Sequence, residues 1–176
     1  VVGVLPGSER PGEYFLYTAH WDHLGKGVAV PGNKSADTTF NGASDNATGI
    51  AALIELARGF GATRPRPQRS IMFVAFTAEE FGTLGSEYFA ANPPVPVAQM
   101  YGGLNMDNLY AIGQARDLTV IGFGASDLDA YLRRAAGRQG GVIVAEPTPE
   151  KGFYYRSDHF NLAKQGEPLL YTKAGI

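Results

Sequence analysis

An eight-residue run of almost entirely apolar residues, Arg69–Phe76 (RSIMFVAF), is the feature that most limits what this chain can fold into. A strand with one face in water alternates apolar and polar residues, whereas this run is polar only at its first two positions. Such a pattern is typical of a strand that is covered on both faces. It predicts a central, largely parallel sheet that carries helices on both sides.

Strand-like and helix-like segments alternate along the rest of the chain. Further strands are expected at 1–5, 14–19, 100–106, 117–121, 142–144 and 168–171. Helices are expected from 44 or 45 to 60, with Gly59 and Gly61 ending this first one, and at 85–91, 125–138 and 157–164. The polar, Gly-rich range 26–42 is expected to be a loop. This order predicts an α/β fold, a three-layer sandwich with a mixed, largely parallel central sheet flanked by helices.

Length and composition exclude several classes of protein. The 176 residues are enough for one domain. The chain has no cysteine, which excludes a thiolate nucleophile, a cysteine-rich zinc finger and an iron–sulfur cluster. With 15 Lys and Arg against 17 Asp and Glu the net charge is −2, so we expect no nucleic-acid partner. No apolar run approaches the roughly 18 residues that span a bilayer, so we expect no membrane segment in this chain.

Imidazole and carboxylate side chains stand where expected strands end or the first helix begins: His20, Asp22, Asp45, Glu79, Glu80 and Asp107. Because ligand sites of open α/β sheets lie at the carboxyl ends of the strands, we expect these side chains to meet at one rim. Imidazole and carboxylate ligands without cysteine are typical of catalytic zinc. Crowded carboxylates repel one another unless cations lie between them, and two metal ions about 3.5–4 Å apart, bridged by one carboxylate, would remove that repulsion.

Each of these residues also has a plain structural interpretation. A histidine at a strand end is more often a surface or hydrogen-bonded residue than a ligand. Asp45 can be a helix N-cap, Glu79 and Glu80 can form a solvated first helical turn, and Asp107 can cap a turn. The occurrence of all of them at one rim favours a metal site over these separate explanations.

Five segments resemble those of a known family: AHWDHLG (19–25), NGASDNATGIAALIELA (41–57), FVAFTAEEFGTLGSEYF (73–89), NMDNL (105–109) and YYRSDHFNLAKQGEP (154–168). Together they resemble the co-catalytic dizinc aminopeptidases of clan MH, relatives of bacterial leucyl aminopeptidase, glutamate carboxypeptidase and glutaminyl cyclase. The resemblance extends over essentially all 176 residues and implies the zinc-peptidase, phosphorylase/hydrolase-like fold. It implies that residues 1–176 are the catalytic domain, and the abrupt start and end of the chain predict that N- and C-terminal segments are missing.

The resemblance implies a role for each residue of the rim. His20 and Asp107 would bind one zinc ion, Glu80 would bind the other, and Asp45 would bridge both. Asp22 would hold the far nitrogen of His20. Glu79 would be the general base, which takes a proton from the metal-bridging water and later delivers it to the leaving amine.

Two further features follow from the same resemblance. Tyr154 stands three residues before Ser157, where some relatives place a tyrosine whose hydroxyl stabilises the tetrahedral oxyanion. Tyr155 is the competing choice for that role. The peptide bond between Asp45 and Asn46 is expected to be cis.

The match is incomplete at the second metal. The family has a fifth protein ligand, a histidine downstream of the SDH segment, and the histidines of this chain are His20, His23 and His159. The last two do not occupy ligand positions of the family, although His159 is an alternative as a replacement ligand. We therefore expect the fifth ligand after Ile176, in an omitted segment, with poor binding of the second zinc as the alternative. A chain that ends there is expected to lose zinc easily from that site and to be weakly active or inactive.

The function implied by the resemblance is that of a zinc exopeptidase, an aminopeptidase that releases N-terminal amino acids from peptides with a free N-terminus. One alternative is a glutaminyl-cyclase-like acyl transferase, which needs a single zinc. Another is an inactive, metal-poor fragment or scaffold. The full carboxylate set argues against the cyclase and against a metal-free scaffold, whereas a metal-poor, weakly active or inactive fragment stays an alternative. The resemblance alone also implies an extracytoplasmic location, that is, periplasmic, secreted or in the cell envelope.

Overall fold

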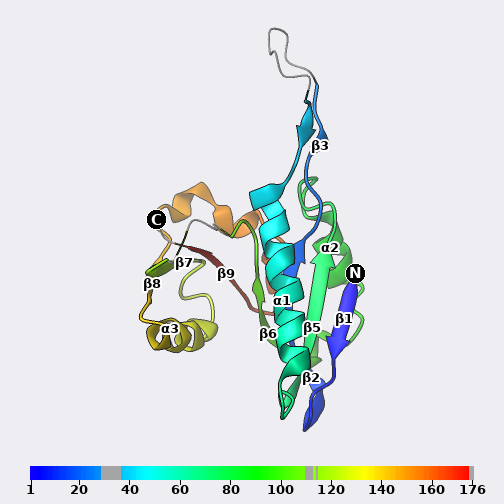
Figure 1. The fold of residues 1–176 in the computed structure, drawn as a ribbon, viewed down its shortest axis with the longest axis vertical. Coiled ribbons are helices and arrows are strands. Elements are labelled where there is room, and N and C mark those ends of the chain that lie inside the picture. The colour runs from blue at the N-terminus through cyan, green and yellow to red at the C-terminus, as the bar shows by residue number, and fades with distance from the viewer. Residues whose placement is uncertain (29–36, 110–112, 114, 175–176) are drawn as a thin grey trace.

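A seven-stranded mixed sheet forms the centre of the computed structural model, which describes residues 1–28, 37–109, 113 and 115–174 (Figure 1). Its strands lie in the order β1-β5-β2-β6-β9-β7-β8. Their bounds are β1 Val2–Leu5, β2 Arg10–His20, β5 Arg69–Phe76, β6 Met100–Asn105, β7 Asp117–Ile121, β8 Val142–Ala145 and β9 Leu169–Ala174. The four strands β5, β2, β6 and β9 are parallel, β1 is antiparallel to β5, and β7 and β8 run antiparallel to β9. The predicted mixed, largely parallel sheet is confirmed.

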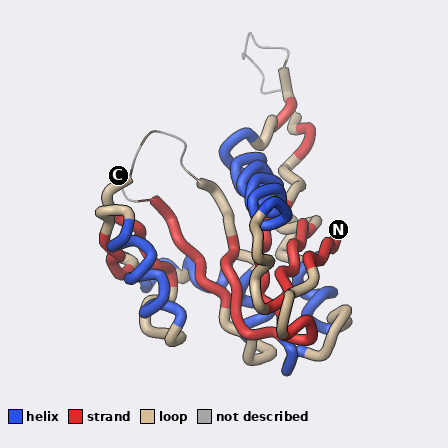
Figure 2. Tube along the Cα trace, turned by 60° about the horizontal axis from the view of Figure 1, so that its bottom comes forward, coloured by secondary structure: helices blue, strands red, loops and turns tan. Residues whose placement is uncertain are grey.

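In the described part of the chain, four α-helices cover the two faces of this sheet. They are α1 Thr48–Ala62, α2 Leu84–Ala91, α3 Leu128–Arg138 and α4 His159–Ala163. Figures 1 and 2 show α1 lying along one face of the sheet. Short turns precede or join these elements: η1 Ala43–Ala47, η2 Val97–Gln99, η3 Pro149–Lys151 and η4 Phe153–Tyr155. None of the helices in the described part of the chain is long and apolar enough to cross a bilayer.

The buried side chains explain the three layers. Along β5, Met72 and Val74 point into a core with Phe89 of α2 and Leu162 of α4. The residue between them, Phe73, points to the opposite face and packs in a second core beneath α1. The apolar run 69–76 is therefore covered on both faces, as its sequence predicts. A third core joins β7 and β8 to α3 through Val120, Ala136 and Ile143.

The first helix differs from its prediction at both ends. It begins at Thr48, after the irregular turn η1, and it continues through Gly59 and Gly61 to Ala62. The expected stop at the two glycines is wrong, because a glycine in helical conformation weakens a helix by roughly 1 kcal/mol without ending it. The helix ends where Thr63 turns extended, two residues before Pro65.

Other boundaries shift by a few residues. The range 26–42, expected to be a loop, contains part of a small antiparallel pair, β3 Gly25–Lys26 with β4 Thr39–Phe40, while 29–36 lie outside the described residues. Strand β2 starts at Arg10 and not at 14, and β9 extends to Ala174. Helices α3 and α4 are shorter than the predicted ranges 125–138 and 157–164.

Candidate metal centre

Three adjacent strands end at the same rim of the sheet and carry the candidate ligands there. His20 is the last residue of β2 and lies in register with Phe76, the last residue of β5. Glu79 and Glu80 follow β5 after a short turn, and Asp107 follows β6, the other neighbour of β2. The convergence arises because all three strands are parallel, so their carboxyl ends meet.

The first group of side chains surrounds the imidazole of His20. Its Nε2 atom lies 3.1 Å from Asp45 Oδ1 and 3.4 Å from Asp107 Oδ1. His20, Glu79 and Asp107 each offer one ligand atom, and these three atoms lie within 4.8 Å of one another. Two ligands of a tetrahedral zinc with bonds of about 2.0–2.1 Å are about 3.3 Å apart. The separations of Nε2 from the two aspartates match that spacing.

A second group lies beside the first. His23, Asp45 and Glu80 also offer ligand atoms within 4.8 Å of one another. Within this group His23 Nδ1 and Glu80 Oε1 are 2.6 Å apart. Asp45 belongs to this group and also contacts His20 of the first, so its carboxylate lies between the two.

The residues present fit a cation. Asp45 Oδ1 is buried and has no hydrogen bond of good geometry among the described residues, although His20 is close to it. A buried carboxylate oxygen without a partner is costly unless a cation satisfies it. Imidazole nitrogen with carboxylate oxygen is the donor set of catalytic zinc sites.

The charges of the site show the same demand for a cation. Burial lowers the pKa of His20, but a hydrogen bond with Asp107, the adjacent carboxylate of Asp45 and the charges of Asp107 and Glu79 outweigh it and raise that pKa to about 11. Burial raises the pKa of Glu79 to about 8 despite the opposing charge of His20. Burial also tends to raise the pKa of Asp107, but hydrogen bonds from His20 and Ser157 outweigh this effect and hold the pKa of its carboxyl below the usual value. Without metal, therefore, a proton on His20 supplies the positive charge that the carboxylates require.

A buried chain of hydrogen bonds orients Asp107. Ser157 Oγ donates to Asp107 Oδ2 at 2.6 Å, and Asn105 Nδ2 donates to Ser157 Oγ at 2.8 Å. Thr18 Oγ1 in turn donates to Asn105 Oδ1 at 2.6 Å. These three residues were not predicted as part of the site. Ser157 lies in the SDH segment and Asn105 in NMDNL, so the quoted motifs contained them without indicating their partners.

Asp22 contacts its neighbours differently from the prediction. His20 Nδ1 donates to the backbone carbonyl of Asp22 at 3.1 Å, whereas the carboxylate of Asp22 is 3.8 Å away. That carboxylate instead accepts the backbone N–H groups of Glu79 and Glu80, at 3.2 and 3.4 Å. The carbonyl therefore directs Nε2 of His20 towards the carboxylates, and the Asp22 side chain positions the two glutamates.

Asp45 is held by the turn before α1. The peptide bond between Asp45 and Asn46 is cis, as expected. Asn46 is buried; its Nδ2 donates to Met106 O, and its Oδ1 accepts the N–H groups of Gly49 and Asn108. The alternative of Asp45 as the helix N-cap does not hold, because α1 begins three residues later without a side-chain cap.

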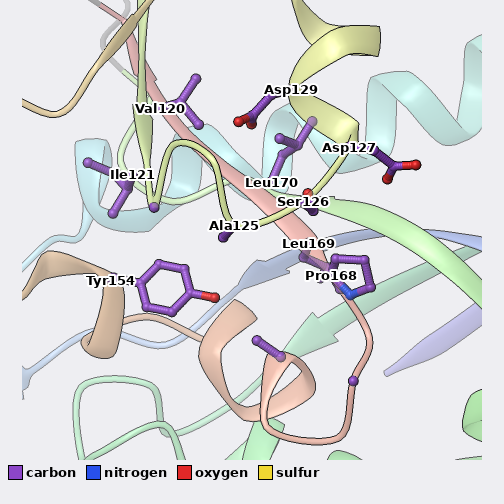
Figure 3. Close-up of a pocket in the computed structure, with 13 residues that line it drawn as sticks. Val120, Ile121, Ala125, Ser126, Asp127, Asp129, Tyr154, Pro168, Leu169 and Leu170 are labelled. Carbon is purple, nitrogen blue, oxygen red and sulfur yellow. The ribbon is translucent and has the colours of Figure 1, made fainter.

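The predicted oxyanion residue Tyr154 lies beside a separate pocket. Figure 3 shows its ring at the edge of a pocket that is lined by the end of β7, the start of α3 and the start of β9. Its ring contacts are with His159, at 4.9 Å between centroids, and with Tyr155 and Phe160. These ring contacts do not join it to the carboxylate groups, so its role stays a prediction. The buried residue Tyr171, which the sequence did not indicate, is close enough to the carboxylates to interact with them. Burial raises the pKa of its hydroxyl, and the charges of Asp107, Glu79 and Asp45 raise it further.

His159 does not join either group of candidate ligands in the described structure. It is fully buried, and both ring nitrogens are without hydrogen-bond partners there. Burial lowers its pKa to about 4, so the ring is neutral. The structure gives no support to the alternative of His159 as a replacement ligand.

A largely parallel sheet with imidazole and carboxylate groups gathered at its carboxyl edge defines an α/β protein with a candidate metal site. The chain belongs to peptidase family M28, whose family model matches residues 1–175. The family that the sequence segments predicted is thereby confirmed, and with it the zinc-peptidase fold.

Relatives and solved structures agree with this assignment. The chain is 37% identical over 110 residues to a "Probable zinc metalloprotease" of Pyrenophora teres f. teres, covering 61% of this chain and 22% of that protein. It is 33% identical over 93 residues to aminopeptidase NAALADL1 of Rattus norvegicus, covering 51% of this chain and 10% of that protein. In fold it is similar to LapB of Legionella pneumophila, with a TM-score of 0.73, 24% identity and coverage of 99% of this chain and 44% of that one. The chain thus spans less than half the length of each of these three proteins.

Proposed function

We propose that this chain is a zinc aminopeptidase, which hydrolyses the peptide bond that follows a free N-terminal residue. The observation that carries the proposal is the spacing of His20 Nε2 from Asp45 and Asp107, 3.1 and 3.4 Å, beside a second carboxylate group that shares Asp45. Family M28 membership and the relatives named as zinc metalloprotease and aminopeptidase support it.

In this proposal His20, Asp45 and Asp107 hold one zinc ion, and Asp45 and Glu80 contribute to a second. Zinc in such a site polarises the substrate carbonyl and lowers the pKa of a bound water towards neutrality. Nδ1 of His20 is already engaged by the carbonyl of Asp22, which leaves Nε2 for the metal.

Glu79 is the proposed general base. Its backbone N–H is anchored by the carboxylate of Asp22, and its carboxylate lies within the group of His20 and Asp107. A cation near these residues lowers the pKa of Glu79 from about 8, so that the carboxylate is ionised near neutral pH and can accept a proton from the attacking water. The same carboxyl can then return the proton to the leaving amine. The free amine of the substrate would be recognised by carboxylates of this site.

The test is the variant Glu79→Gln, assayed with an aminoacyl anilide after zinc loading. We expect the turnover to fall by about 10²–10⁴-fold with the zinc content unchanged, because the amide cannot accept the proton. Glu87→Gln, on the exposed surface of α2, is the matched control and should keep full activity. Undiminished turnover of the Glu79 variant would contradict the proposed mechanism. Cyclisation of an N-terminal glutaminyl peptide without anilide hydrolysis would contradict the aminopeptidase proposal.

A further inference from the structure

His23 is a third residue of the HWDH segment that reaches the metal centre. It is half-buried, and its ring packs edge-on against Phe40 of β4 at 6.3 Å between centroids. Its Cβ lies against Gly42, where an added Cβ would come within 2.9 Å of it. Gly42 has a positive φ of 65°, a conformation in which glycine carries no steric penalty. The backbone of this turn can therefore approach His23 closely and hold the imidazole beside the second group of carboxylates.

The short distance between His23 and Glu80 indicates the kind of interaction. Two ligands of one tetrahedral zinc stand about 3.3 Å apart, which matches His20 with its aspartates. His23 Nδ1 and Glu80 Oε1 are only 2.6 Å apart. That is a short hydrogen-bond distance and not the separation of two ligands of one ion, and since a carboxylate accepts from an N–H, we assign the imidazole as the donor.

Glu80 is thereby held at two points. Asp22 Oδ2 accepts its backbone N–H at 3.4 Å, and His23 donates to its side chain. The carboxylate keeps further lone pairs for a cation, and Asp45 lies within ligand distance in the same group.

We propose that His23 is a positioning residue for the second metal: its Nδ1–H fixes the carboxylate of Glu80 in the orientation that binds a cation shared with Asp45. The proposal rests on the proposed function, because it concerns the same metal centre. Groups that orient a ligand in this way typically account for 10–100-fold in metal affinity.

The experiment compares the unmodified chain with His23→Ala and His23→Asn. Asparagine places an amide N–H close to the position of Nδ1 but is a poor zinc ligand, so it separates a hydrogen-bonding role from direct ligation. Trp21→Ala, an exposed residue in the same segment, is the matched control. Zinc stoichiometry and affinity are measured by calorimetric titration, and the absorption spectrum of the cobalt-substituted protein reports the ligands of the metal. Circular dichroism checks that each variant is folded.

We expect His23→Ala to weaken the second zinc by about 10–100-fold and to leave the first unchanged. His23→Asn should restore most of the affinity and leave the cobalt spectrum as in the unmodified chain. If the alanine variant binds two zinc ions as tightly as the unmodified chain, His23 has no such role. The proposal also fails if asparagine does not restore affinity and the cobalt spectrum changes, because that is the result expected for a direct ligand. It fails as well if the unmodified chain binds one zinc only. A chain that binds no zinc at all overturns the proposed function as well, so the two failures are distinguishable.

Discussion

Ser157 donates a hydrogen bond of 2.6 Å to Oδ2 of Asp107 while Oδ1 of the same carboxylate lies 3.4 Å from His20 Nε2. One oxygen of Asp107 is thus fixed by the protein, and the other is left for the metal centre. Ser157 is itself buried, and its Oγ accepts a hydrogen bond from the side-chain amide of Asn105, so the orientation of its hydroxyl is fixed.

Replacing Ser157 by alanine should therefore affect both zinc and stability. The change leaves Asp107 Oδ2 and the amide of Asn105 without a partner in the interior, which costs about 1–3 kcal/mol of unfolding free energy. We expect the first zinc to bind about 10–100-fold more weakly. Denaturant unfolding and zinc titration measure the two effects. Ser8→Ala, at an exposed serine whose hydroxyl bonds the backbone carbonyls of Arg66 and Pro67, should leave the zinc affinity unchanged. An unaltered zinc affinity in the Ser157 variant would show that the bond does not orient the ligand.

Zinc binding should release protons. At pH 7 the metal-free site carries a proton on His20, whose pKa is about 11, and for the most part on Glu79, whose pKa is about 8. Metal ligands must be deprotonated, and a nearby cation lowers the pKa of a carboxyl, so about one to two protons leave per first zinc. Calorimetric titration in buffers of different ionisation enthalpy measures this number. A binding enthalpy that is the same in all buffers would contradict the charge state described here.

Two glycines of α1 should respond in opposite directions to alanine. An added Cβ at Gly49 would collide with the side chain of Asn46 and with the carbonyl of Met106. Because Asn46 anchors the turn that carries Asp45, Gly49→Ala should destabilise the fold by about 1–3 kcal/mol, as overpacking typically does, and weaken zinc binding. Gly59 has open space around its Cα, so Gly59→Ala should stabilise by about 0.5–1 kcal/mol. Thermal unfolding of the two variants tests the pair, and equal effects would contradict it.

Glu167 should make stability depend on pH. Its side chain is buried, its Oε1 accepts the N–H of Gly102 at 2.6 Å, and burial raises its pKa to about 7. The folded state therefore retains a proton that the unfolded state releases near pH 4.5, so this residue lowers stability as the pH rises from about 4.5 to about 7.

Glu167→Gln keeps the acceptor for Gly102 and removes the ionisable group. We expect this variant to match the unmodified chain near pH 4 and to exceed its unfolding free energy by about 1–3 kcal/mol at pH 8. Urea unfolding at a series of pH values gives the difference between the two proteins. A difference that does not grow with pH would show that Glu167 is ionised in the folded state.

Several strands of the sheet could be predicted because their sequences are continuous runs of apolar residues. The apolar run 69–76 became β5 with the same bounds, and 117–121 became β7. The end of α1 could not be predicted from the sequence. A glycine such as Gly59 or Gly61 ends a helix when it adopts a left-handed conformation, and the sequence does not show which conformation a glycine adopts. Similarly, Ile54 lies one turn of the helix after Ile50 in the sequence, a spacing typical of one apolar face, yet 61% of it is exposed.

Part of the metal centre could likewise be predicted from the sequence, and part could not. Residue types at strand ends indicated the approach of His20, Asp45 and Asp107, because the rim of a parallel sheet brings such positions together. The contacts of Asp22 and His23 depend on the path of a loop to within an ångström. No spacing rule describes that path, so the hydrogen bond from His23 to Glu80 became visible only in the structure.

The shared position of Asp45 has a thermodynamic consequence. A cation drawn to the His20 side orders this carboxylate and removes part of its charge, and a cation on the Glu80 side does the same. Occupancy of either side must then change the affinity of the other by the same factor, whichever ion arrives first. The zinc affinities of the two halves of the centre are therefore expected to be coupled and not independent.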